Sequence, residues 1–117
     1  MSLQIELKPR RDILVVRLSG ELDHHTADGV RRQIDEAIVR DGYTHLVFSL
    51  RELTFMDSSG LGVILGRYKR INQQNGTLAV CALSPAVKKL FDLSGMHKIL
   101  RAYEREEEAL ASLGVAS

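Results

Sequence analysis

Hydrophobic residues alternate with polar ones at the start of the chain and recur at helical spacing further along it. The alternation over 3–7 predicts a half-buried strand, and the nearly continuous apolar run over 13–18 predicts a second strand that is covered on both faces. Residues 8–11 between them, which include Pro9, predict a turn. The two strands are close enough in sequence to pair as an antiparallel hairpin.

The rest of the chain alternates between helical and extended patterns. In chain order, these patterns predict a helix over 27–38, a strand over 46–50, a helix over 61–68, a strand over 78–83, a helix from Pro85, a short edge strand over 98–102 and a helix over 104–113. Asp23 and Ser84 are candidate N-caps, and Gly42 and Gly95 are candidate helix ends. Strands that alternate with helices imply right-handed crossovers. The expected fold is α/β, with a mixed, mostly parallel sheet of four to five strands and about four helices.

Composition indicates one globular domain over 1–117. Hydrophobic residues make up 44% and charged residues 26%, which excludes a disordered chain. The net charge of +1 argues against a nucleic-acid binder and against a polybasic membrane anchor. No apolar run approaches the roughly 20 residues that span a bilayer, and the N-terminus lacks the apolar run of a secretory signal. The single cysteine, Cys81, is expected to be an inert core thiol, and we expect a cytoplasmic protein.

Candidate chemistry lies in two loops. In α/β sheets, binding sites gather at the loops that leave the carboxyl ends of the strands, and the loops over 20–26 and 54–60 are expected to lie side by side. The second loop places one carboxylate and two hydroxyls at 57–59, where a helix begins. These residues can simply cap the helix by accepting hydrogen bonds from its first amides. Alternatively, Ser58 is a modification site, because a helix N-terminus tolerates a phosphate.

Other chemical interpretations fail on residue type. A phosphate-binding P-loop needs Lys and Ser or Thr after its glycines, but an apolar run follows Gly62. A nucleophile elbow needs Gly two residues before the serine, where Met56 stands. His24 and His25 are adjacent and point about 100° apart on a helix, so we expect no metal site. No set of acid, base and nucleophile is present, so we expect neither an enzyme nor a cofactor.

A small basic group lies on the helix that follows the second loop. It comprises Arg67, Lys69 and Arg70. Such a group is either a solvated helix face or a charged contact for an acidic protein partner. The spacing of the three residues leaves both interpretations open.

Two motifs carry a resemblance to a known family. The segments 20–23 and 55–62, the second of which contains Asp-Ser-Ser-Gly-Leu-Gly, resemble the anti-sigma factor antagonist family, the STAS domain class. The resemblance continues through 63–69 and 84–88 to the C-terminal 113–117, and therefore covers the whole chain. It is greatest to the sporulation members of the family.

The resemblance implies a partner switch. An unmodified antagonist of this family binds an anti-sigma factor that is also an ATP-dependent serine kinase, which frees the sporulation sigma factor. The resemblance implies that this kinase phosphorylates Ser58, that the phosphate abolishes binding, and that a PP2C-type phosphatase reverses the change. Asp23 matches the binding loop of the family, and Asp57, Ser59 and Gly60 flank the phosphoacceptor, so all four are expected to bind the partner.

Two other functions remain open at this point. One is a stress-pathway antagonist that works by the same switch with other partners. The other is a module that binds a small molecule or nucleotide at the same helix start. In each case we expect a monomer that contacts neither nucleic acid nor membrane directly.

Overall fold

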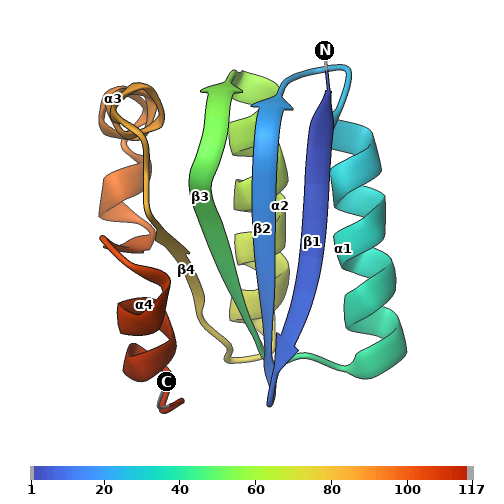
Figure 1. Ribbon diagram of the computed structural model, residues 1–117. Helices are drawn as coiled ribbons and strands as arrows, with labels where there is room; N and C mark the ends of the chain where they lie inside the picture. The colour runs from blue at the N-terminus through green and yellow to red at the C-terminus, as the bar shows by residue number, and fades with distance from the viewer. Residues whose placement is uncertain (1, 116–117) are drawn as a thin grey trace.

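The computed structural model describes residues 2–115 and contains one mixed sheet with helices on both faces (Figure 1). The elements follow in the order β1 (Leu3–Arg10), β2 (Ile13–Leu22), α1 (Ala27–Asp41), β3 (His45–Met56), α2 (Ser58–Gln73), β4 (Leu78–Cys81), α3 (Pro85–Ser94), a 3-10 helix (Met96–Lys98), β5 (Arg101–Tyr103) and α4 (Glu106–Ser112). The strand order is β1-β2-β3-β4-β5, with β1 antiparallel to β2 and the other neighbours parallel. The predicted α/β class, hairpin and mixed sheet are confirmed.

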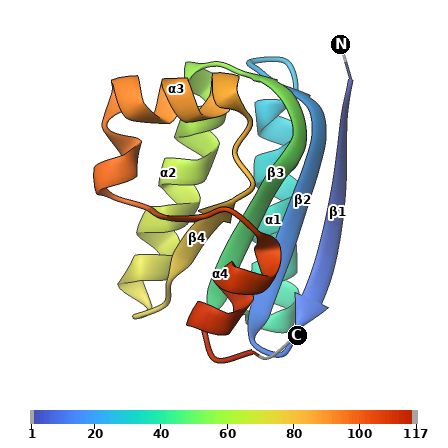
Figure 2. The ribbon, with the colours of Figure 1, turned by 60° about the vertical axis from the view of Figure 1, so that its left-hand side comes forward.

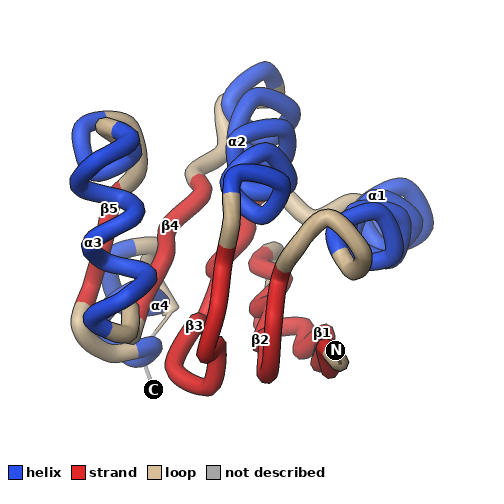
Figure 3. The backbone as a smooth tube through the Cα atoms, turned by 90° about the horizontal axis from the view of Figure 1, so that it is seen from above, coloured by secondary structure: helices blue, strands red, loops and turns tan. Residues whose placement is uncertain are grey.

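The two faces of the sheet are covered unequally. Because β2 to β5 are consecutive neighbours joined by crossovers of one hand, α1, α2 and α3 fall on the same face. Figure 2 shows α4 in front of the strands, and Figure 3 shows α1 and α2 next to each other on one side of the sheet. Leu14 packs in the core below α1 to α3, whereas its neighbour Val15 packs below α4 with Leu110. Burial on both faces explains the continuous apolar run in β2.

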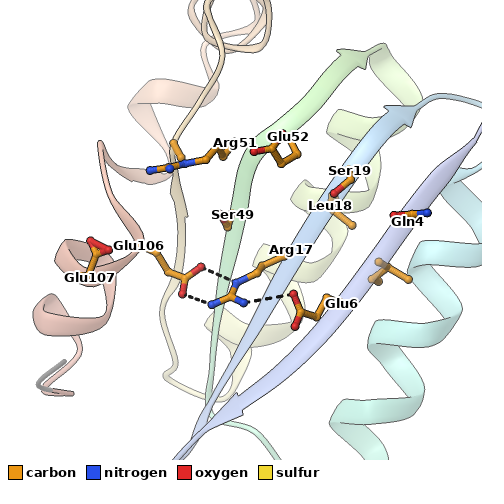
Figure 4. Close-up of a pocket in the computed structure, with 12 residues that line it drawn as sticks. Gln4, Glu6, Arg17, Leu18, Ser19, Ser49, Arg51, Glu52, Glu106 and Glu107 are labelled. Carbon is orange, nitrogen blue, oxygen red and sulfur yellow. Dashed lines mark hydrogen bonds and ion pairs between the residues drawn. The ribbon is translucent and has the colours of Figure 1, made fainter.

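An ion pair joins α4 to the open face of the sheet (Figure 4). The Arg17 guanidinium donates to both carboxylate oxygens of Glu106, at 2.9 and 2.7 Å, and a third bond reaches Glu6 at 3.3 Å. The hydrogen bonds from Arg17 hold the pKa of Glu106 below its ordinary value, against the opposing effect of burial. These charges border a hollow of about 460 Å³ on the polar part of this face. The two parallel hydrogen bonds from Arg17 to Glu106 stabilise the position of α4.

The hairpin turn differs from the prediction. The turn lies at Arg11 and Asp12, and not over 8–11, because β1 continues to Arg10. Pro9 is a strand residue paired with Leu14. A proline is tolerated there because β1 is an edge strand. Arg11 takes the left-handed conformation, with φ at 57°, that closes this short turn.

Several element boundaries also differ from the sequence pattern. The third strand continues beyond 46–50 to Met56, since its second half pairs with the end of β2 although one side is polar. The second helix begins at Ser58, three residues before its first periodic apolar residue. The last strand is Arg101–Tyr103, because a 3-10 helix occupies the preceding residues. The predicted C-caps Gly42 and Gly95 are confirmed, both with positive φ.

The last two residues of the segment that carries the family resemblance, Ala116 and Ser117, lie outside the described residues. Within residues 2–115, no helix combines the length and the apolar character needed to cross a bilayer.

Candidate functional site

The carboxyl ends of β2 and β3 lie side by side, because the two strands are parallel and Leu22 is paired with Met56. Asp23 and Asp57 are the residues that directly follow this pair. The Asp57 amide donates a hydrogen bond to the Leu22 carbonyl at 3.3 Å, which ties the two strand ends together. The two loops therefore form one surface at one end of the sheet, as predicted.

Asp57 is the N-cap of α2. Its Oδ1 accepts hydrogen bonds from the amides of Ser59 at 2.9 Å and Gly60 at 3.3 Å. The capping interpretation is therefore correct for Asp57. It does not compete with the modification interpretation, because Ser58 is the first residue of the helix and its side chain is exposed.

Asp23 repeats this arrangement on the neighbouring loop but is buried. Its Oδ1 accepts hydrogen bonds from the amides of His25 at 2.9 Å and Thr26 at 3.1 Å. Burial alone raises the pKa of Asp23, but these amide bonds outweigh it and hold the pKa below its ordinary value. Only 3% of Asp23 is exposed. Its carboxylate therefore holds the loop in shape.

The predicted N-cap role of Asp23 requires a correction. The first helix begins at Ala27 with Thr26 in the N-cap position, so Asp23 caps the turn that precedes the helix. Thr26 had no signal in the periodicity, yet its hydroxyl donates to the Glu21 carbonyl at 2.9 Å and accepts from the Asp23 amide at 3.0 Å. A short polar side chain three residues after a candidate cap is the only sequence signal of this role.

Gly60 allows α2 to approach the end of β2. A Cβ at this position would lie 2.6 Å from Met56 Cγ, 2.9 Å from Leu22 Cγ and 3.0 Å from the Leu22 carbonyl oxygen. Gly60 is therefore buried by close packing, whereas Ser59 beside it is half-buried. Together these contacts fix where the first turn of α2, and with it Ser58, stands on the surface.

His24, a residue of the predicted first loop, lies at the same surface. Its Nδ1 is 4.0 Å from Asp57 Oδ2, and its side chain is largely exposed. His24 and His25 have ring centroids 3.9 Å apart. Among residues 2–115, no three His, Cys, Asp or Glu side chains gather as a metal site would require. The two histidines thus belong to the polar surface around Ser58.

Comparison with known proteins identifies the family. The STAS domain matches residues 4–109. The chain is 59% identical to the anti-sigma F factor antagonist of Paenibacillus polymyxa over 117 residues, which covers 100% of both chains. Its fold is similar to that of the anti-sigma factor antagonist SpoIIAA in its unphosphorylated form, with a TM-score of 0.75, 33% identity and coverage of 97% of this chain and 100% of that chain. The similarity to the Bacillus cell fate determinant SpoIIAA in the phosphorylated form is comparable, with a TM-score of 0.76, 34% identity and coverage of 94% and 99%. The chain therefore belongs to the STAS-domain family of anti-sigma factor antagonists.

Proposed function

We propose that this chain is the antagonist in a partner switch controlled at Ser58. In the unmodified form it binds an anti-sigma factor that is also an ATP-dependent serine kinase, and this binding releases the sporulation sigma factor in the cytoplasm. Phosphorylation of Ser58 by that kinase ends the binding, and a PP2C-type phosphatase reverses it. The observation that carries the proposal is the exposed side chain of Ser58 at the first position of α2, on the surface formed by both loops.

A phosphate on Ser58 changes the charge of this surface without requiring a change of fold. A phosphoserine adds about −1.5 to −2 charges, directly beside the Asp57 carboxylate. The partial positive charge and free amides of a helix N-terminus tolerate an anion, so α2 is expected to keep its position. A micromolar complex corresponds to about 8 kcal/mol. Like charges that meet across an interface cost several kcal/mol, which is enough to dissociate such a complex.

Besides Ser58, four residues are expected to support partner binding, and they divide into an exposed pair and a buried pair. Asp57 and Ser59 are partly exposed and can contact the partner. Asp23 and Gly60 are buried, so they support binding by holding the first loop and by allowing the close approach of α2. Asparagine at 23 keeps an oxygen that accepts both amide bonds, whereas alanine does not. D23N should therefore bind like the parent chain, and D23A should bind more weakly. If D23N weakens binding as much as D23A does, the partner reads the charge of Asp23 directly.

The phosphorylation step is tested with the anti-sigma F factor of the organism that encodes this chain. The purified proteins are incubated with ATP, and mass spectrometry locates the modified residue. The parent chain should gain one phosphate on Ser58, and S58A should gain none. S19A, altered on the open face of the sheet, is the matched control and should be modified like the parent (Figure 4). Modification at another residue, or none in the parent chain, would contradict the proposal.

The binding step is tested by titration calorimetry with the same anti-sigma factor. S58A should bind with the affinity of the parent chain, and S58D should bind more weakly because it carries a permanent negative charge. Equal affinity of S58D and the parent would refute the electrostatic argument. A parallel titration with an anti-sigma B factor distinguishes the sporulation switch from a stress-pathway switch, since the proposed partner should bind more tightly.

A further inference from the structure

A groove opens between the first turns of α1 and α2, beside the surface that carries Ser58. Its volume is about 300 Å³. Its polar lining comes from His24, Asp28 and Arg31 on the first loop and α1, and from Ser59 and Arg67 on α2, where Gly62 also lines it. The two helices lie next to each other on one face of the sheet (Figure 3). The groove thus continues the Ser58 surface along the helix pair.

The groove and the helix faces beside it carry more arginines than carboxylates. The Asp35 carboxylate faces three guanidinium groups, with Arg67 Nε at 3.0 Å, Arg70 Nη1 at 3.5 Å and Arg31 Nη1 at 3.9 Å. Asp28 pairs with Arg31 and, at 3.6 Å, with Arg32. Four arginines therefore share two carboxylates, which leaves a local excess of two positive charges. The whole chain has a net charge of +1, so this excess is a local feature.

Arg67 lies at the centre of this cluster. Its side chain is 11% exposed, and burial lowers its pKa, with Arg31 and Arg70 lowering it further and Asp35 opposing the change. The N–H groups of Arg67 are not aimed at Asp35 despite the short distance, and Nη1 has no hydrogen-bond acceptor among the described residues. Arg67 therefore contributes positive charge to the wall of the groove, and the more exposed guanidinium groups of Arg31 and Arg70 are the ones that can pair with a further carboxylate.

Attachment of α1 to α2 does not account for all these charges. One pair, Asp35 with Arg67, is enough to join the two helices, whereas the side chains of Arg31 and Arg70 are 45% and 37% exposed. The face of α2 beside the groove also has unfilled space next to two glycines. A Cβ at Gly62, or at Gly66 one turn later, would have no heavy atom within 4 Å. Alanine would favour the helix at both positions, so the chain itself does not use this space.

We propose that the groove between α1 and α2 docks an acidic segment of the anti-sigma factor, with Arg31, Arg67 and Arg70 as its cations. The inference rests on the proposed function and adds the chemistry of the partner's contact. Charge complementarity selects an acidic segment, and the continuity of the groove with Ser59 places that segment beside the phosphoacceptor. Of the basic residues on α2, Arg67 and Arg70 thus form the acidic-partner contact.

The test compares two double variants in titration calorimetry with the anti-sigma F factor. The groove variant is R31Q/R70Q. The control is R40Q/R101Q, which removes the same number of arginines from the last turn of α1 and from β5, both exposed and away from the groove. The groove variant should raise the Kd by about threefold to tenfold and weaken its dependence on salt. The control should keep the Kd of the parent chain.

A second pair of variants provides an answer even if the groove variant is unstable. G66E places a carboxylate on the face of α2 that carries Gly62, one turn beyond the groove lining, and G66Q adds a side chain of the same size without charge. G66E should bind the anti-sigma factor more weakly than G66Q. Equal Kd values for R31Q/R70Q and its control, or for G66E and G66Q, would overturn the groove assignment while the proposed function stands. Failure of the parent chain to bind at all would overturn the proposed function itself.

Discussion

Alanine should have opposite effects on stability at two glycines of the same helix. At Gly60, the new Cβ would lie 2.6 Å from Met56 Cγ and 3.0 Å from the carbonyl oxygen of Leu22. The Met56 side chain can adjust, but the carbonyl belongs to the end of β2 and cannot move without shifting the strand. At Gly66, the new Cβ would meet nothing within 4 Å. The two substitutions are chemically identical, so their difference reports packing alone.

The expected magnitudes follow from two opposing effects. Alanine in place of glycine stabilises a helix by up to about 1 kcal/mol, and this gain applies at both positions. Overpacking a tight contact costs about 1 to 3 kcal/mol, and this cost applies at Gly60 only. G66A should therefore raise the free energy of unfolding by up to about 1 kcal/mol. The two variants should differ by about 1 to 3 kcal/mol, or by about 4 to 12 °C in Tm for a domain of this size.

Urea denaturation followed by circular dichroism measures both free energies of unfolding. The slope of the transition should be the same for the parent chain, G60A and G66A, because each exposes the same surface on unfolding. A stabilised G60A, or equal unfolding free energies for the two variants, would refute the packing argument. In that case α2 would not be held against β2 by close contact at Gly60.

Three other properties can be measured directly. D57A should lose about 1 kcal/mol of stability because it removes the helix cap. D57N should lose little, because asparagine caps equally well. If urea denaturation shows the same loss of stability for both variants, Asp57 does not act as a cap. E106Q should lower stability by about 1 to 2 kcal/mol at neutral pH. Arg17 lowers the folded pKa of Glu106 below its ordinary value of 4.5. The stability that the ion pair contributes is therefore complete above pH 4.5 and disappears as the pH falls through the folded pKa. The stabilities of the parent chain and E106Q should converge in acid. Burial raises the pKa of Cys81 to about 11. Iodoacetamide should therefore label Cys81 in urea but not in the native protein. Rapid labelling of the native protein would contradict this prediction, because it requires an accessible thiolate.

Much of the fold could be predicted because its signals are local. Helical spacing, the Ser84-Pro85 start and the glycines at 42 and 95 depend on residues within a few positions of one another. The boundaries were less accurate where pairing with a distant strand decided them. The second half of β3 has an exposed polar side, and it is a strand because it pairs with the end of β2.

In the candidate site, too, the features that depend on neighbouring residues could be predicted, and those that depend on distant residues could not. The exposed position of Ser58 and the cap at Asp57 follow from a short motif at a helix start. The burial of Asp23 does not, since it depends on how the loop after β2 folds onto the rest of the molecule. The contact of Asp35 with Arg67 joins two helices that are separated by a strand, and no spacing in the sequence indicates it.

The amino-acid sequence by itself determined the order of the strands and helices, the two loops at the strand ends and the serine at the start of α2. These depend on periodicity, capping and turn chemistry, which act over a few residues. The tertiary structure alone decided that Leu22 lies beside Met56, that Arg17 and Glu106 hold α4 on the opposite face, and that four arginines share two carboxylates between α1 and α2. These contacts join residues that are distant in the chain, and they arise only once the sheet has brought its helices together.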